Sequence, residues 1–245
     1  AGKSRMTTSL LSSKEMPFWE SGSIYIVRAG SRAYGTNLPS SDEDIRGVCI
    51  PPAEYIIGLK QWEQHEDKGH DRTIYGLHKF VRLALNCNPN IIELLHVREE
   101  DILHITESGR RLRRFAPRFL SKRAFKTFGG YAFAQLQLIH KGKTARHGSH
   151  VGLVGQHGWD TKNGLHLIRL LRMGVEILRT GEVHTYRPDR TELLDIRHGR
   201  WSLDQMLAES DRLNAELKAA YEASFLPDEP DYRSPARKPM PSGVG

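Results

Sequence analysis

Residues 30–44, GSRAYGTNLPSSDED, place a Gly-Ser pair ahead of an Asp-x-Asp pair. If the second pair lies on a strand, Asp42 and Asp44 project from one face and Glu43 from the other, because side chains alternate along a strand. Carboxylates that share a face can bridge two divalent cations about 3.5–4 Å apart, which stabilise the attacking and leaving oxygens during phosphoryl or nucleotidyl transfer. The pair therefore predicts a metal-dependent phosphate site with Asp42 and Asp44 as catalytic metal ligands.

A third carboxylate from a neighbouring strand would complete such a site. Asp71 opens the next strand candidate, DRTIYGL, and is the preferred third ligand, whereas Glu66 and Asp67 are nearby alternatives. Gly30 and Ser31 would bind the nucleotide, since a turn without a side chain lets backbone N–H groups and a hydroxyl approach a triphosphate. Turn acids and a hairpin glycine are the simpler interpretation, because an isolated Asp-x-Asp recurs by chance, but the combination with Gly-Ser is a sharper signal.

A second set of polar residues lies on the clearest helix of the sequence, which Asp160 or Thr161 caps and Gly181 ends. Lys162, His166 and Arg169 recur there at helical spacing beside a separate stripe formed by Leu165, Ile168, Arg172 and Val175. The cationic face can hold nucleotide phosphates or the backbone of an acceptor, and an ordinary solvated face is equally compatible with the spacing.

Several elements must position these residues. The β-branched and aromatic run at 23–27 predicts a buried strand that breaks at Gly30-Ser31, and a second strand contains the Asp-x-Asp pair and ends at Pro51-Pro52. After a mixed-charge loop, the third strand runs from Asp71 into an amphipathic helix that ends near Asn88-Pro89. The fold class expected is α+β, with a small mixed sheet.

The division expected is a catalytic domain at 16–108, a helical substrate-binding domain at 109–225 and a disordered Pro-rich tail at 226–245. The helical part should contain a helix over 121–140 loosened at Gly129-Gly130, a mobile loop over 141–158 and a helix over 203–223. Four histidines lie in or next to this loop, with neither a cysteine nor a helical His pair, so a flexible loop is favoured over a zinc site (His140, His147, His150 and His157). A P-loop at GKT is also rejected, because no strand leads into it.

Charge suggests an anionic partner. The formal net charge is +7, and the interval between Glu107 and Asp160 holds eleven Lys and Arg residues without one acid. Such a segment should face a nucleic acid or, in the simpler interpretation, water. Aromatic residues in the same region could stack on bases but are more often core (Phe125, Phe128, Tyr131 and Phe133).

Composition excludes other classes of protein. The chain has 38% hydrophobic residues and no apolar run near the ~20 that a membrane span needs, so a membrane partner is not expected. Cys49 and Cys87 lack metal-ligand spacing and are expected to be buried thiols in a reducing, cytoplasmic setting.

The motifs together carry a family resemblance. AGSRAYGTNLPSSDEDIRGVCIPP resembles the nucleotidyltransferase signature of the DNA polymerase beta superfamily, and with FVRLALNCNPNIIELL and HLIRLLRMGVEILRTGE it is similar to predicted bacterial and phage nucleotidyltransferases that include RNA-repair-pathway polymerase-beta-like proteins. The resemblance covers about residues 22–225. It implies a polymerase-beta-like palm, Gly30 and Ser31 at the triphosphate of an NTP, and two Mg²⁺ ions, replaceable by Mn²⁺, on Asp42, Asp44 and Asp71.

The function expected is transfer of NMP from an NTP, ATP among the candidates, to a hydroxyl acceptor with release of pyrophosphate. RNA is a more plausible acceptor than DNA, while protein and small-molecule acceptors, the base and the subunit number stay open. Two alternatives remain: a catalytically inactive module that binds nucleic acid through the basic 110–146 stretch, and a glycosyltransferase whose Asp-x-Asp holds the metal of a nucleotide sugar.

Overall fold

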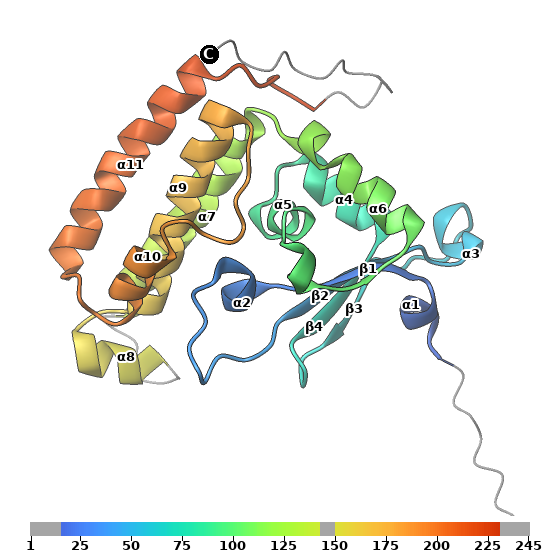
Figure 1. Ribbon diagram of the computed structural model, residues 1–245, viewed down its shortest axis with the longest axis horizontal. Helices are drawn as coiled ribbons and strands as arrows, with labels where there is room; N and C mark the ends of the chain where they lie inside the picture. The colour runs from blue at the N-terminus through green and yellow to red at the C-terminus, as the bar shows by residue number, and fades with distance from the viewer. Residues whose placement is uncertain (1–15, 143–149, 231–245) are drawn as a thin grey trace, which may run out of the picture.

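The computed structural model describes residues 16–142 and 150–230, and Figure 1 shows a small sheet beside a bundle of long helices. The sheet has five strands in the order β3-β4-β2-β1-β5. Its central strands β1 (Ser23–Arg28) and β2 (Ile45–Cys49) are antiparallel, while β2 and β4 (Arg72–Gly76) are parallel. The mixed sheet and the many helices confirm the predicted α+β class.

Two strands were not predicted from the sequence. The edge strand β3 (Gln64–Asp67) lies in the segment expected to be a mixed-charge loop, and β5 (Ile102–Ile105) lies at the opposite edge. Both are only four residues long, and β3 is almost entirely polar, so neither shows the apolar alternation by which strands are recognised. These two strands are stabilised by pairing with β4 and β1, and not by the strand propensity of their own residues.

Helices lie on one side of the sheet in Figure 1: α4 (Leu77–Leu85), α5 (Pro89–Leu95) and α6 (Glu107–Arg114). The expected helix ends near Asn88 as predicted, but Pro89 then starts α5, whose first turn is capped by the Asn88 side chain accepting from the Asn90 N–H at 3.1 Å. Short helical segments complete this part of the chain: α1 (Phe18–Ser21), α2 (Gly30–Tyr34), α3 (Ala53–Ile56), η1 (Glu99–Asp101) and η2 (Ala116–Phe119).

The helical part is built from α7 (Arg123–Gly142), α9 (Thr161–Thr180) and α11 (Leu203–Ala223), with α8 (His150–His157) and α10 (Arg190–Arg197) at one end (Figure 1). The predicted bounds of α9 are confirmed, because Asp160 accepts from two backbone N–H groups and Gly181 ends the helix at φ +70°. Two expectations were wrong: α7 continues through Gly129-Gly130, and the expected mobile loop contains α8.

Buried apolar residues of the sheet side and of the long helices form one continuous cluster, from Ile24 to Leu226. Its largest fully buried side chains include Phe80 and Ile91 beside the sheet and Phe128 and Leu171 in the bundle. The division at 108/109 therefore stays a prediction. Residues 231–245 of the expected tail and 143–149 of the expected loop lie outside the described residues.

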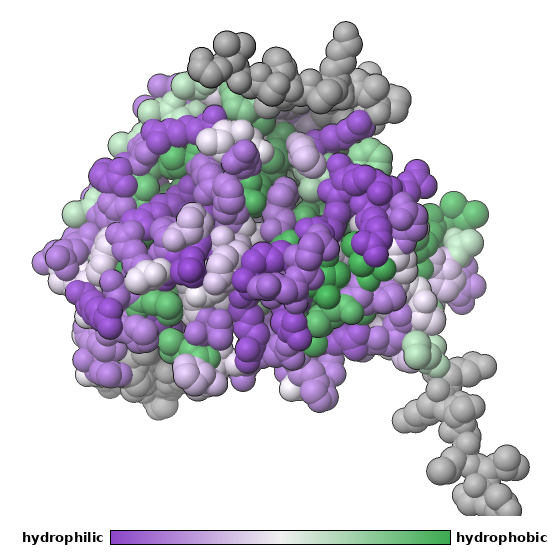
Figure 2. Space-filling model, viewed as in Figure 1, coloured by the Kyte–Doolittle hydropathy of each residue, from purple (hydrophilic) through white to green (hydrophobic). Residues whose placement is uncertain are grey.

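The surface seen in Figure 2 is mainly polar, with apolar side chains gathered over α3, where Ile57 and Leu59 are fully exposed. No helix among the described residues is both long and apolar enough to cross a bilayer. Cys49 and Cys87 are buried free thiols, as predicted.

Candidate active site

The turn after β1 brings the backbone of Gly30 against a carboxylate. Gly30 has φ +60°, and a Cβ built on it would lie 1.8 Å from Oδ2 of Asp44. The Ala29 N–H also donates to the Asp44 carbonyl at 2.8 Å. Only glycine permits both this backbone conformation and this close approach, so the requirement for glycine at position 30 comes from Asp44. The Gly-Ser pair begins α2 and does not form a simple hairpin.

Asp44 and Asp71 lie side by side because each directly precedes one of two parallel neighbouring strands. Ile45 pairs with Arg72 in the register of β2 and β4, and the Ile45 N–H donates to the Asp71 carbonyl at 3.1 Å. Asp71 itself has φ +43°, an uncommon conformation for a residue with a side chain. The turn before β4 therefore holds the carboxylate next to the start of β2.

Asp42 joins them from the preceding loop and not from a strand, which corrects the expected strand face, since β2 begins at Ile45. The loop is tied to α2 by Arg32, whose guanidinium donates to the Ser41 carbonyl at 3.2 Å. Asp42, Asp44 and Asp71 nevertheless line one pocket of about 290 Å³ together with Gly30 and Ser31. Asp42 and Asp44 therefore face the same pocket, as predicted, but the loop before β2 brings them together and not the alternation of side chains along a strand.

Arg46, the second residue of β2, contacts both carboxylates. Its guanidinium donates to the Asp71 carbonyl at 2.5 Å and to Asp71 Oδ1 at 2.9 Å, and lies 3.6 Å from Asp44 Oδ1. Burial, together with hydrogen bonding to and repulsion from the adjacent Asp71 carboxylate, raises the pKa of Asp44 to about 6. Hydrogen bonding from Asp44 lowers the pKa of Asp71, and Arg46 lowers it too. One arginine thus serves two acids, and Asp44 retains unbalanced negative charge.

This donor set fits a hard divalent cation. Mg²⁺ and Mn²⁺ prefer carboxylate oxygens, and a cation would offset the repulsion that raises the pKa of Asp44. Across residues 16–142 and 150–230, however, three or more His, Cys, Asp or Glu side chains nowhere converge closely enough to form a complete metal site. The protein offers the carboxylates without holding all three at ligand distance from one point.

The opposite wall of the pocket comes from the helical part. Lys162 and His166 project from α9, and Arg197, at the end of α10, completes the wall. Burial, together with the cationic Arg169, Lys162 and Arg197, lowers the pKa of His166 to about 3, so its imidazole is neutral at pH 7. The expected cationic face therefore contains an uncharged ring that lies edge-on to Tyr34, with centroids 6.4 Å apart.

Arg197 was missed from the sequence, because it lies on a short helix whose spacing to Lys162 carries no periodic signal. Its position is fixed by contacts between helices. Thr161 Oγ1 donates to the Arg197 carbonyl at 2.9 Å. Arg172, which the sequence placed on the apolar stripe, donates to Asp189, which precedes α10, at 2.9 Å and to Glu192 of α10 at 2.6 Å.

Arg169 does not reach the pocket, which corrects its predicted role in nucleotide binding. It is 3% exposed, forms an ion pair with Glu93 of α5, and stacks 3.7 Å from the ring centroid of Tyr34. The Tyr34 hydroxyl donates to the same Glu93 carboxylate at 2.6 Å. One turn separates the residues that face the pocket from one that faces the core, a difference that helical spacing alone does not resolve.

The alternative third carboxylates lie elsewhere. Asp67 on β3 bonds His70 at 2.7 Å, Glu66 bonds Gln64 on the same strand, and neither lines the pocket. Among the expected ligands, the structure therefore brings Asp71 to the Asp-x-Asp pair.

Ion pairs tie several cations of the described part of the basic stretch to nearby acids. Arg113 pairs with Glu99, and Arg114 pairs with Glu107 at 2.8 Å. Lys122 and Arg123 approach Asp228 and Glu229 at 3.6 and 2.9 Å. Acids from outside the stretch therefore lie against four of its nine described cations, while Lys143 and Arg146 fall outside the described residues. Its aromatic residues divide between buried, stacked and exposed positions (Phe128, Phe125 on Tyr221, and Phe133).

Comparison with known proteins decides the family. A family model described as the RNA repair pathway DNA polymerase beta family (RlaP) matches residues 13–237. The chain belongs to this family. Membership confirms the resemblance expected from the Gly-Ser and Asp-x-Asp motifs, indicates a polymerase-beta-like nucleotidyltransferase, and favours it over the glycosyltransferase alternative.

Two curated relatives are similar over a short segment. An uncharacterized 38.9 kDa protein in the nrdC-mobD intergenic region of Enterobacteria phage T4 is 30% identical over 83 residues, which cover 29% of this chain and 24% of that protein. The uncharacterized protein YcgL of Bacillus subtilis (strain 168) is 33% identical over 76 residues, 29% of each chain. The matches thus span less than a third of these relatives.

A solved nucleotidyltransferase-like protein from Exiguobacterium sibiricum 255-15 aligns with 82% of this chain and 69% of its own, at 11% identity and a TM-score of 0.30.

Proposed function

We propose that this protein transfers NMP from an NTP to a hydroxyl acceptor and releases pyrophosphate. The observation that carries the proposal is the composition of one pocket. It holds two aspartates at the starts of neighbouring strands and a third on the adjoining loop, a glycine backbone packed against one of them, and two cations on the facing helices. Transfer from a triphosphate needs both parts, since negative charge must be stabilised at the reacting phosphorus and on the leaving pyrophosphate.

Lys162 and Arg197 are suited to bind the β- and γ-phosphates, because they are the fixed cations of the pocket wall. Gly30 lets the backbone lie directly against Asp44 at the pocket wall. The Ser31 hydroxyl, which makes no hydrogen bond within the described chain, is available as a donor to a phosphate. His166 supplies a neutral wall, which avoids a third positive charge beside Lys162.

Asp42, Asp44 and Asp71 would hold two Mg²⁺ ions, or Mn²⁺ in their place. When bound, these ions supply neutralisation of charge on the attacking and leaving oxygens. Arg46 holds Asp71 in position through two hydrogen bonds. The Asp71 carboxylate assists removal of the acceptor hydroxyl proton; the oxygen then bonds to the α-phosphorus as the bond to the pyrophosphate oxygen breaks and pyrophosphate departs with that electron pair.

RNA is the acceptor class favoured over DNA. The family is described by an RNA repair pathway, and the chain has a net charge of +7. The base of the donor nucleotide stays open, with ATP the first to test.

The proposal is tested by incubating the full chain with each α-labelled NTP, Mg²⁺ or Mn²⁺, and RNA, DNA or protein acceptors. Asp42→Asn and Asp44→Asn should each lower transfer by at least 100-fold while leaving the unfolding transition in place, and EDTA should abolish transfer by the unchanged protein. Asp67→Asn on β3 is the matched control, since that carboxylate lies outside the pocket. Full activity in both pocket variants would overturn the mechanism, and salt-sensitive RNA binding without transfer would support the inactive module instead.

A further inference from the structure

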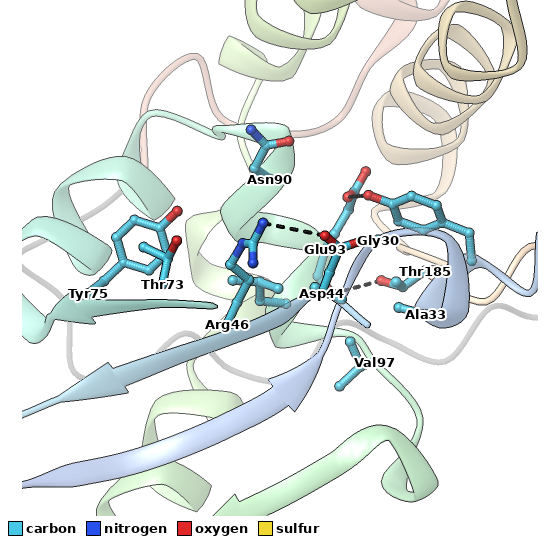
Figure 3. Close-up of a pocket in the computed structure, with 13 residues that line it drawn as sticks. Gly30, Ala33, Asp44, Arg46, Thr73, Tyr75, Asn90, Glu93, Val97 and Thr185 are labelled. Atoms are coloured by element: carbon cyan, nitrogen blue, oxygen red, sulfur yellow. Dashed lines mark hydrogen bonds and ion pairs between the residues drawn. The ribbon is translucent and has the colours of Figure 1, made fainter. Parts of the chain in front are cut away.

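A second pocket, of about 250 Å³, also borders Asp44 (Figure 3). It shares Gly30, Tyr34 and Asp44 with the first pocket, so one carboxylate borders both cavities. The remaining walls come from α2, β4 and α5, together with Arg46 of β2, Val97 and Thr185. Nothing in the nucleotide-binding roles described above uses this space.

Three side chains of the second pocket have unused hydrogen-bonding groups. Thr73 and Tyr75 stand on the same face of β4, two residues apart, and Asn90 lies above them in the first turn of α5 (Figure 3). None of the three forms a side-chain hydrogen bond within the described part of the chain. A hydroxyl, a phenol and a carboxamide that converge without protein partners are suited to bind a polar ligand.

The charges around this pocket are largely offset within the protein. Arg46 is held by Asp71 and lies near Asp44. Glu93 forms its ion pair with Arg169 and accepts from the Tyr34 hydroxyl. The pocket is therefore polar without the excess of positive charge that a triphosphate requires, whereas Lys162 and Arg197 provide that excess in the first pocket.

The two pockets suit the two substrates of a group transfer. The nucleophile and the leaving group lie on opposite sides of the reacting phosphorus, so acceptor and pyrophosphate must approach the carboxylates from different directions. If the first pocket holds the triphosphate, the second opens on the acceptor side of Asp44. Its polar lining without excess positive charge suits a terminal nucleoside of a chain better than a triphosphate.

We infer that the second pocket binds the terminal nucleoside of the acceptor RNA, with Thr73, Tyr75 and Asn90 as its specificity-determining residues. The inference rests on the proposed nucleotidyltransferase function. Tyr75 offers an aromatic ring for the base, and Asn90 and Thr73 offer hydrogen bonds to the base edge and the ribose hydroxyls. The attacking hydroxyl then lies at the Asp44 end of the pocket.

Steady-state kinetics with α-labelled ATP and a short oligoribonucleotide separate this role from a role in donor binding. Asn90→Ala and Thr73→Val should each raise the acceptor KM roughly threefold to tenfold, the effect of one lost neutral hydrogen bond, while the ATP KM stays unchanged. Asn214→Ala, on α11 and outside both pockets, is the matched control. An unchanged acceptor KM in both pocket variants, or an equal rise in the ATP KM, would overturn the inference.

Photocrosslinking tests the same pocket without requiring transfer. An RNA with 4-thiouridine as its last nucleotide, incubated with the full chain in the absence of NTP, should crosslink within residues 72–97, and Asn90→Ala should reduce the yield. Crosslinks confined to other segments, or none at all, would overturn the inference.

Crosslinking within residues 72–97 by a protein that transfers no label would leave the pocket assignment standing and remove the proposed function. Label transfer to RNA with crosslinks elsewhere would do the reverse, and label on protein hydroxyls alone would exclude a nucleoside acceptor.

Discussion

Replacing Glu93 by Gln should destabilise the protein far more than an isosteric change on the surface does. Glu93 and Arg169 form an ion pair in which both side chains are 4% exposed, and the Tyr34 hydroxyl donates to the same carboxylate. Gln can still accept a hydrogen bond, but Arg169 keeps its charge and loses the counter-charge. Its Nε, moreover, already lacks a hydrogen-bond partner.

Removing one partner of a buried pair costs about 3–5 kcal/mol, because the remaining charge is left uncompensated. In a chain of this size each kcal/mol lowers Tm by about 2–4 °C, so Glu93→Gln should lower Tm by about 6–20 °C. Urea denaturation followed by circular dichroism gives the free energy directly. Glu107→Gln, which breaks the exposed pair with Arg114, is the matched control and should leave the midpoint almost unchanged.

A double-variant cycle identifies the cause. Glu93→Gln combined with Arg169→Met removes the uncompensated charge. The double variant should therefore lose less free energy of unfolding than the sum of the losses in the two single variants, by about 0.5–3 kcal/mol. The reasoning is refuted if Glu93→Gln costs no more than Glu107→Gln, or if the cycle is additive.

Three further predictions concern the first pocket. Gly30→Ala should abolish transfer, because a Cβ there meets the neighbouring aspartate at 1.8 Å and a φ of +60° adds about 1–2 kcal/mol of strain, whereas Gly130→Ala, with open space around it, should retain activity. Arg197→Ala should raise the NTP KM roughly 10- to 150-fold through loss of a charge-assisted contact, measured against Arg200→Ala, which lies outside the pocket; equal effects would contradict the assignment. The folded-state pKa of His166 is about 3, below its ordinary value near 6.5. Between these two pH values the unfolded chain binds a proton at His166 that the folded chain does not. The free energy of unfolding is therefore lost progressively as the pH falls below about 6.5. Urea denaturation in EDTA between pH 4 and 7.5 should show a shallower pH slope for His166→Gln, by up to about 1.4 kcal/mol per pH unit, and an unchanged slope would show that the ring is protonated in the folded state.

The sequence predicted those features that depend on local patterns. The caps of α9 at Asp160 and Gly181 follow from side-chain and backbone chemistry within one turn, and they are confirmed. The meeting of Asp44 with Asp71 was expected, because the sequence placed Asp44 on the second strand and Asp71 at the start of the third. The sequence did not predict that the two residues meet at a parallel pair of strands or that a loop carries Asp42. Both depend on the order of the strands in the sheet, which no local pattern encodes.

Failures of prediction occurred where tertiary contacts decide. The polar strand β3 exists because β4 offers it an edge, although its own residues resemble a loop. Arg169 has the spacing of a pocket residue but lies one helical turn after His166, where its side chain is buried in the core against Glu93 and Tyr34. Arg197 enters the pocket because ion pairs and a hydrogen bond hold α10 against α9, and these contacts join residues far apart in the sequence.

The central claim, that the aspartate pocket transfers a nucleotidyl group, is tested most directly by following two positions of one donor. The full chain is incubated with Mg²⁺, an RNA acceptor and either α-labelled or γ-labelled ATP, and both the acceptor and the released phosphates are separated. The predicted result is α-label on RNA and γ-label in pyrophosphate, with both lost in Asp44→Asn. Label from the γ-position on the acceptor, or γ-label released as inorganic phosphate with none of the α-label transferred, would contradict it.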